Sequence, residues 1–195
     1  MANSNTPFGL RPVQTLGAPN YVGKIEKFYV PSTDNTAIGL GDPVTIVGAG
    51  GLSTDGYPIA TRGSSTAVVC GVMVGVVPIP TDLTLTYRKA STGMYILVDT
   101  DPNTIYEIQE DSVGGYVALA DGTKNANYVL GTVDTTTGNG KTMLDSSAVS
   151  ASATKDLLML RPVTAADNVF PGNYTKWMVK LNLHQYASGV VRVGV

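Results

Sequence analysis

Short apolar segments with polar residues at alternate positions recur along most of the chain, and Gly, Pro, Asn and Asp separate them. Alternation with a period of two is typical of half-buried β-strands, and the separating residues favour turns. Only 145–156 and 181–186 leave room for short helical turns, and neither carries a sustained apolar stripe. The pattern predicts strands at Lys24–Val30, Pro43–Val47, Tyr57–Thr61, Ala67–Val77, Leu83–Arg88, Tyr95–Val98, Thr104–Gln109, Tyr116–Ala120, Tyr128–Val133, Leu157–Val163, Thr175–Asn182 and Val190–Val193.

About ten short strands with turn residues between them predict an all-β fold, a sandwich or a jelly-roll-like barrel. The chain of 195 residues is long enough to bury a sizeable core, and no shift in composition marks a linker. We therefore expect a single β domain over residues 20–195, preceded by an extended N-terminal arm over residues 1–19.

The expected arm contains three prolines and two glycines and has neither a helical nor a strict strand period. Its apolar anchors Phe8, Leu10, Val13 and Leu16 would each contribute about 1.5–3 kcal/mol if buried, whereas ordering each residue costs about 1–2 kcal/mol. These anchors alone would not hold the arm down. We therefore expect the arm either to stay mobile or to gain backbone hydrogen bonds at a sheet edge of its own or a neighbouring subunit. A frayed terminus is the simpler alternative.

The stretch Tyr95–Gln109 has two apolar runs around Asp99-Thr100-Asp101-Pro102-Asn103, whose residues favour a turn. It predicts a β-hairpin or a bulged strand pair that organises the sheet, with Asp99 and Asp101 at an acidic tip that a partner could contact. The spacing of Asp99, Asp101 and Asn103 opens like a calcium loop. However, Thr104 replaces the required Gly and the flanks are strands rather than helices, so we expect a structural turn and no metal.

Charged residues make up 14% of the chain and hydrophobic residues 43%, with a net charge of −2. So few charges suggest a surface that is polar but neutral, or covered by a partner. The absence of a basic run argues against nucleic acid as a partner. Ala67–Val77 is too short to cross a membrane and is followed by Pro78, so we expect no membrane partner. No signal peptide is visible at the N-terminus, which predicts assembly in a cytoplasm.

The residues that could support catalysis are few. Cys70 is the single cysteine and lies in an apolar run, which predicts a buried, inert thiol. His184 is the single histidine, and no nucleophile elbow accompanies it. Thr135–Thr142 ends like a P-loop but lacks the first Gly and the βα alternation, so we expect a polar loop. We therefore predict no enzyme activity, no catalytic residues, no cofactor and no bound metal.

Four segments together resemble the cement, or head decoration, proteins of tailed bacteriophages. They are MANSNTPFGLRPV at the N-terminus, GDPVTIV at Gly41–Val47, ILVDTDPNTIYEIQ at Ile96–Gln109 and VKLNLHQY at Val179–Tyr186. The resemblance implies an all-β body without catalysis, self-association into dimers or trimers, and contacts that bridge neighbouring major capsid proteins. It also implies a location on the capsid exterior of the virion, after assembly in the host cytoplasm.

The expected function is therefore that of a structural virion protein that stabilises a phage capsid lattice from outside. We expect Phe8, Leu10, Arg11 and Val13 to form the interface with a partner, either the major capsid protein or another copy of this chain. The alternative is a carbohydrate-binding or tail-associated β-module, which would need an exposed aromatic platform with polar partners.

Overall fold

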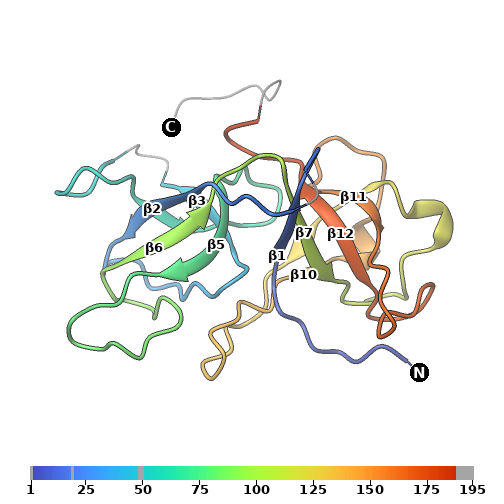
Figure 1. The fold of residues 1–195 in the computed structure, drawn as a ribbon, viewed down its shortest axis with the longest axis horizontal. Coiled ribbons are helices and arrows are strands. Elements are labelled where there is room, and N and C mark those ends of the chain that lie inside the picture. The colour runs from blue at the N-terminus through green and yellow to red at the C-terminus, as the bar shows by residue number, and fades with distance from the viewer. Residues whose placement is uncertain (1, 19, 48–50, 188–195) are drawn as a thin grey trace.

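The computed structural model describes residues 2–18, 20–47 and 51–187, and the regular secondary structure of these residues is almost entirely antiparallel β-sheet (Figure 1). The predicted all-β fold is confirmed, whereas the strand expected at Val190–Val193 lies outside the described residues. Two 3₁₀ helices, η1 (Leu119–Asp121) and η2 (Ser146–Ala148), interrupt the strands. The strands are β1 (Arg11–Thr15), β2 (Ile25–Val30), β3 (Pro43–Ile46), β4 (Ala60–Arg62), β5 (Gly71–Val76), β6 (Met94–Asp99), β7 (Thr104–Gln109), β8 (Asn125–Ala126), β9 (Tyr128–Val129), β10 (Met143–Leu144), β11 (Leu157–Pro162) and β12 (Lys176–Leu181).

Ten of the strands form two five-stranded sheets that lie in two lobes, side by side in Figure 1, and β9 and β10 form a two-stranded sheet. The first sheet has the order β1-β7-β12-β11-β8 and the second has the order β2-β6-β5-β3-β4. All strands of the second sheet fall between β1 and β7 in the sequence. The second lobe is therefore an insertion into the first, and the N-terminal region contributes an edge strand of the first sheet.

The second sheet curls until its ends, β2 and β4, approach one another. In the second sheet, Tyr29 of β2 forms a bridge with Ile59, next to β4, and the Tyr29 amide donates to Pro58 over 3.0 Å. In the first lobe, Leu144 of β10 forms a bridge with Glu110, directly after β7. Each lobe encloses its own apolar core, because alternate side chains of every strand face inward. Phe28, Val44, Ile96 and Val98 belong to the second core, and Tyr106, Ile108, Leu157, Trp177 and Val179 belong to the first.

The predicted hairpin over Tyr95–Gln109 is wrong, although both of its strands are present. β6 pairs with β2 and β5 in the second sheet, whereas β7 pairs with β1 and β12 in the first. The turn between them carries the chain from one lobe to the other. A turn signal in the sequence cannot distinguish these outcomes, because distant strands satisfy the backbone hydrogen bonds of both β6 and β7.

The acidic tip expected at this turn is not exposed either. Asp99 and Asp101 are only 0% and 3% exposed. Asp99 accepts a 3.1 Å hydrogen bond from the hydroxyl of Tyr106, and Asp101 accepts one of 2.9 Å from the amide of Asn103. Burial, followed by the charge of Asp99, raises the pKa of Tyr106 well above its ordinary value, so this hydroxyl stays a donor. The turn is thus an internal junction between the lobes rather than a partner contact.

Two further strand predictions are wrong. Leu83–Arg88 is a loop around the fully buried side chain of Arg88, which donates to the carbonyls of Pro31 and Asp34 over 2.7 Å each. Tyr116–Ala120 runs through a loop into η1. In both segments the alternation of residue types is real, but among the described residues the only β-bridge formed by either segment joins Arg88 to Ile38.

Buried polar groups join the two lobes. Asp42, which precedes β3, accepts 2.8 Å and 2.7 Å hydrogen bonds from Arg62 and Thr142. Arg62 also donates to the Gly131 carbonyl of the first lobe over 2.6 Å. Asp156 of the first lobe accepts hydrogen bonds from Ser65 and the Thr66 amide of the second. These contacts fix the relative position of the lobes.

Candidate partner-binding groove

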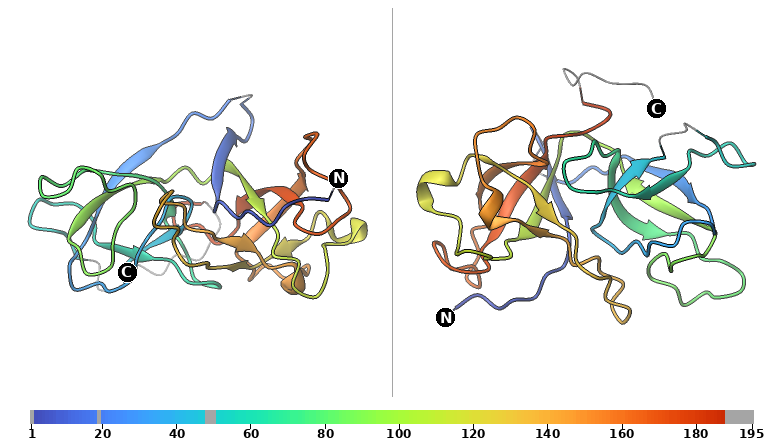
Figure 2. Two further views of the ribbon diagram at one scale, coloured as in Figure 1. Left: turned by 90° about the horizontal axis from the view of Figure 1, so that it is seen from below. Right: turned by 180° about the vertical axis from the view of Figure 1, so that it is seen from behind.

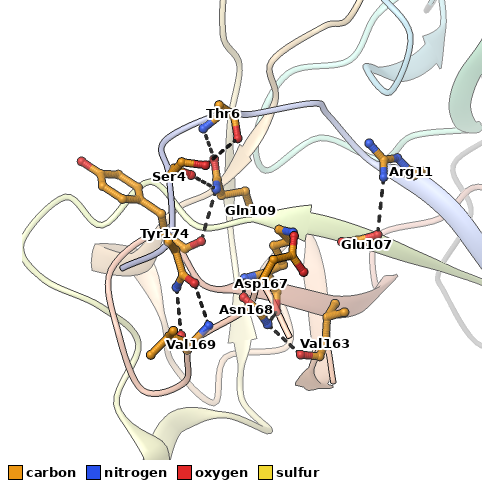
Figure 3. A network of polar contacts seen from close by, with 12 residues as sticks. Ser4, Thr6, Arg11, Glu107, Gln109, Val163, Asp167, Asn168, Val169 and Tyr174 are labelled. Atoms are coloured by element: carbon orange, nitrogen blue, oxygen red, sulfur yellow. Dashed lines mark hydrogen bonds and ion pairs between the residues drawn. The ribbon is translucent and has the colours of Figure 1, made fainter. Parts of the chain in front are cut away.

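The first residues of the chain are held against the first lobe, as Figure 3 shows. The buried Gln109 side chain accepts a 3.0 Å hydrogen bond from the Thr6 amide and donates over 2.7 Å to the Ser4 carbonyl. Asn3 exchanges two hydrogen bonds with the backbone of Val169, of 2.6 Å and 2.8 Å. Of the alternatives expected for this segment, the structure shows attachment to the sheet edge of its own chain.

Further along, the same segment contacts the second lobe through two glycines. The Leu10 amide donates to the Gly41 carbonyl over 2.8 Å. Gly9 and Gly41 both have a left-handed backbone, with φ of +80° and +81°. A Cβ atom on Gly9 would lie 2.9 Å from the Gly41 Cα atom, closer than such atoms approach. Glycine is therefore required on both sides where the segment crosses between the lobes.

The four residues predicted to form the interface have different environments in the structure. Leu10 is 1% exposed and packs in the first core, so it supports the chain's own fold. Val13 is half-buried at a bulge in β1. Phe8 and Arg11 come together at the surface, where the guanidinium carbon lies 4.2 Å from the centre of the Phe8 ring. Arg11 also lies 3.8 Å from Glu107 on β7.

Phe8 and Arg11 stand between two adjoining hollows at the junction of the lobes, which we call the seam groove. One hollow of about 470 Å³, the polar end, carries charged side chains next to apolar ones, and the other, of about 280 Å³, the apolar end, has a more apolar lining. Phe8, Arg11 and Asn139 line both. The other residues of the polar end are Asn5, Thr6, Pro7, Asp134, Thr137, Lys141 and Lys176, and those of the apolar end are Leu10, Pro12, Leu40, Gly41, Met73 and Val74.

Three cations from separate parts of the chain meet at the polar end: Arg11, Lys141 and Lys176. Lys141 pairs with Asp134 over 3.2 Å, and Lys176 pairs with Asp167 outside the hollow. The amides of Thr136 and Thr137, and then Lys141, lower the pKa of Asp134, so it remains a carboxylate. Each lysine contacts its partner through one ammonium group that has three donors, which leaves donors for a ligand.

Sequence reasoning missed Asn139, Lys141 and Lys176. The first two lie in the segment Thr135–Thr142, which forms the polar loop predicted for it. Lys141 has a φ of 49°, a left-handed conformation that costs a residue with a Cβ atom about 1–2 kcal/mol. No local signal could have placed these residues beside Phe8, because three distant segments meet there.

The groups that could support other chemistry lie away from the groove. Cys70 is buried, and burial raises the pKa of its thiol to about 12. His184 is buried as well, and its Nδ1 atom accepts a 3.1 Å hydrogen bond from the Tyr186 amide. The described residues contain no group of three His, Cys, Asp or Glu side chains that could hold a metal ion. None of their helices is long and apolar enough to cross a membrane.

No protein-family model matches the chain, and comparisons with curated proteins and with solved structures found no match. We therefore infer the function from the resemblance of the four sequence segments and from the geometry of the seam groove.

Proposed function

We propose that the protein is a structural virion protein that binds the outside of a tailed-phage capsid and bridges neighbouring major capsid proteins. The observation that carries this proposal is the seam groove, in which Phe8 and Arg11 lie together at the surface between the lobes. Aromatic residues and arginine are the side chains most often found at the centre of protein interfaces. Phe8 and Arg11 also belong to the N-terminal segment that resembles the phage proteins.

Two exposed loops support a bridging role. Loop 77–93 projects from the second lobe and carries Leu83, which is 72% exposed. Loop 110–122 projects from the first lobe and carries Leu119, which is 74% exposed. The two loops lie at opposite ends of the molecule in Figure 1 and Figure 2. A protein with apolar loop tips at both ends and a groove between them can contact more than one capsid subunit.

Capsid shells that lack this protein provide the test. Purified protein is mixed with such shells and the bound copies are located by electron microscopy, while light scattering of the free protein reports whether it forms the proposed dimers or trimers. We expect saturable binding at symmetric lattice positions and shells that resist heating better than bare shells. Protein that stays unbound at saturating concentration would overturn the proposal.

A second candidate function, carbohydrate binding, is favoured by a tyrosine cluster on the outer face of the second sheet. Tyr29 and Tyr95 face one another across β2 and β6 with ring centres 5.1 Å apart, and Tyr57 lies 5.4 Å from Tyr95. Asp55 accepts a hydrogen bond from Tyr95 and supplies a polar partner. However, the Lys27 ammonium lies 3.8 Å from the Tyr57 ring centre, where a sugar would stack. This candidate therefore ranks second.

A glycan array separates the two candidates. Carbohydrate binding predicts retention of specific glycans by the free protein and loss of that binding in Tyr57→Ala. Glycan binding without affinity for shells would replace the capsid proposal with this one.

A further inference from the structure

We propose that the seam groove binds an extended acidic segment of the capsid subunit, with an apolar side chain in one hollow and carboxylates in the other. This inference rests on the proposed function, because it takes the capsid subunit as the partner. It adds the chemistry of the contact and names the residues that recognise each part of the segment.

The apolar hollow is suited to one anchoring side chain. Pro12, Leu40, Met73 and Val74 line it, and these residues come from both lobes. Met73 is fully buried in the second core, so the half-buried Pro12, Leu40 and Val74 supply the apolar surface that a ligand would meet. The Phe8 ring also lines this hollow and carries Arg11 on its face.

The polar hollow is suited to carboxylates. Arg11, Lys141 and Lys176 line it, and Asp134 is the only carboxylate among its lining residues. Arg11 and Lys176 have their carboxylate partners, Glu107 and Asp167, outside the lining of this hollow, and the Asp167 side chain is 71% exposed. Asp134 is also fully engaged, since one oxygen accepts from the Thr136 and Thr137 amides and the other pairs with Lys141. An incoming carboxylate therefore meets more donors than competing acceptors.

Arg11 is the residue best placed to change partner. Its side chain is 57% exposed, and its contact with Glu107 is a single long pair of 3.8 Å. An arginine has five donors in a planar fork that fits a carboxylate with two parallel hydrogen bonds. Binding of an acidic segment would add two such hydrogen bonds to Arg11, while the guanidinium keeps its contact with the Phe8 ring.

The edge of the first sheet argues for recognition by side chains rather than by strand addition. β1 is the edge strand, but Pro12 lacks an N–H group and the register of β1 shifts between Pro12 and Gln14. Proline and bulges are the features that prevent another strand from pairing with an edge. The partner segment therefore lies in the groove and contacts the side chains that line it.

The first experiment identifies the segment directly. A photo-crosslinking p-benzoylphenylalanine replaces Thr137, which is exposed and lines the polar hollow, and the variant is bound to shells and irradiated. The same replacement at the exposed Thr154, which lies outside both hollows, is the control. We expect Thr137 to link to a capsid peptide that has an apolar residue next to Asp or Glu. A link to a peptide without acidic residues, or to a second copy of this chain, would overturn the inference.

The second experiment removes the cations. Lys141→Gln and Lys176→Gln should each weaken binding to shells roughly ten-fold, because each removes one charge-assisted hydrogen bond. Lys24→Gln is the control, since Lys24 also pairs with one aspartate, Asp101, and lies outside both hollows and both exposed loops. Unfolding midpoints of all variants confirm that they are folded.

The outcomes separate the inference from the proposed function. If the unmodified protein binds shells and the Lys141→Gln and Lys176→Gln variants bind as well as Lys24→Gln, the acidic segment is ruled out while the capsid proposal stands. If the unmodified protein does not bind shells, both fail together. Weaker binding at raised salt by the unmodified protein, and a smaller salt effect in the lysine variants, is the expected accompanying result.

Discussion

The hydroxyl of Thr142 donates a 2.7 Å hydrogen bond to the carboxylate of Asp42, which lies 100 positions earlier in the other lobe. The same oxygen of Asp42 accepts from Arg62, and its second oxygen accepts from the Gly39 amide. Burial raises the pKa of Asp42 even though Arg62 lowers it. The carboxylate thus couples the position of the inserted lobe to the loop that carries Lys141.

Replacing Asp42 with Asn should therefore destabilise the whole protein. Arg62, whose side chain is 12% exposed, would lose its ionic partner, and breaking a buried pair in this way costs about 3–5 kcal/mol. Urea unfolding measures the loss. Asp82→Asn is the control, because Asp82 is a surface carboxylate paired with Lys89, and its unfolding midpoint should hardly move. Equal effects of the two substitutions would contradict the role given to Asp42.

Gly9 should tolerate a side chain less well than Gly17. Both have a left-handed φ, so alanine at either position costs about 1–2 kcal/mol in backbone strain. Only at Gly9 does the added Cβ also meet backbone atoms of Gly41, whereas nothing lies within 4 Å at Gly17. We expect Gly9→Ala to be less stable than Gly17→Ala by a further 1–3 kcal/mol or so in thermal unfolding. Equal stability would mean that the two lobes can separate at this point without cost.

Glu110 should titrate above its ordinary pKa of 4.5, because burial raises its pKa more than its hydrogen bonds from Trp177 and the Val117 amide lower it. Between pH 4.5 and this raised value, the folded state binds more protons than the unfolded state. Glu110 therefore contributes stability that is fully present below pH 4.5 and is lost as the pH rises through the folded pKa. The unfolding free energy of the protein, minus that of Glu110→Gln, should increase as the pH falls from neutral.

Trp177 gives a direct readout of this titration, since it is the single tryptophan and its indole N–H donates to Glu110 over 3.0 Å. Its fluorescence should change at a pH above 4.5, and the change should be absent in Glu110→Gln. A transition at or below 4.5 would show that the site stabilises the carboxylate rather than the protonated acid.

Leu10 and Phe8 should respond differently to alanine although they are two residues apart. Leu10 lies in the first core, and removing a buried leucine side chain costs about 2–5 kcal/mol. Phe8 is half-buried at the groove, so Phe8→Ala should lower the unfolding midpoint less while weakening binding to shells more than its stability explains. If the loss of shell binding is proportional to the loss of stability in both Leu10→Ala and Phe8→Ala, the separate roles given to the two residues are contradicted.

Much of the fold could be predicted from local patterns. The alternation at β2, β3, β5, β11 and β12 indicates strands correctly, because these segments are half-buried or central and their residue types fit a sheet. The pairing could not be predicted. The sequence around β1 predicts an extended arm, because Pro7, Gly9 and Pro12 interrupt the strand pattern. The segment becomes a strand only because β7 offers a free edge.

The candidate site could be predicted in part. The N-terminal motif drew attention to Phe8 and Arg11, which do meet at the groove, but it also included Leu10, which the fold needs for itself. The lysines of the groove come from a loop and a strand that only the tertiary structure brings near the N-terminus. Isolated lysines carry no pattern in the sequence, so no sequence argument could have selected them.

Whether the seam groove faces the capsid can be seen in a reconstruction of shells saturated with the protein. We expect one copy per symmetric site, oriented with Phe8, Arg11 and Lys141 against the major capsid protein. Bound copies whose groove faces solvent, with the tyrosine cluster around Tyr95 against the shell, would contradict this expectation.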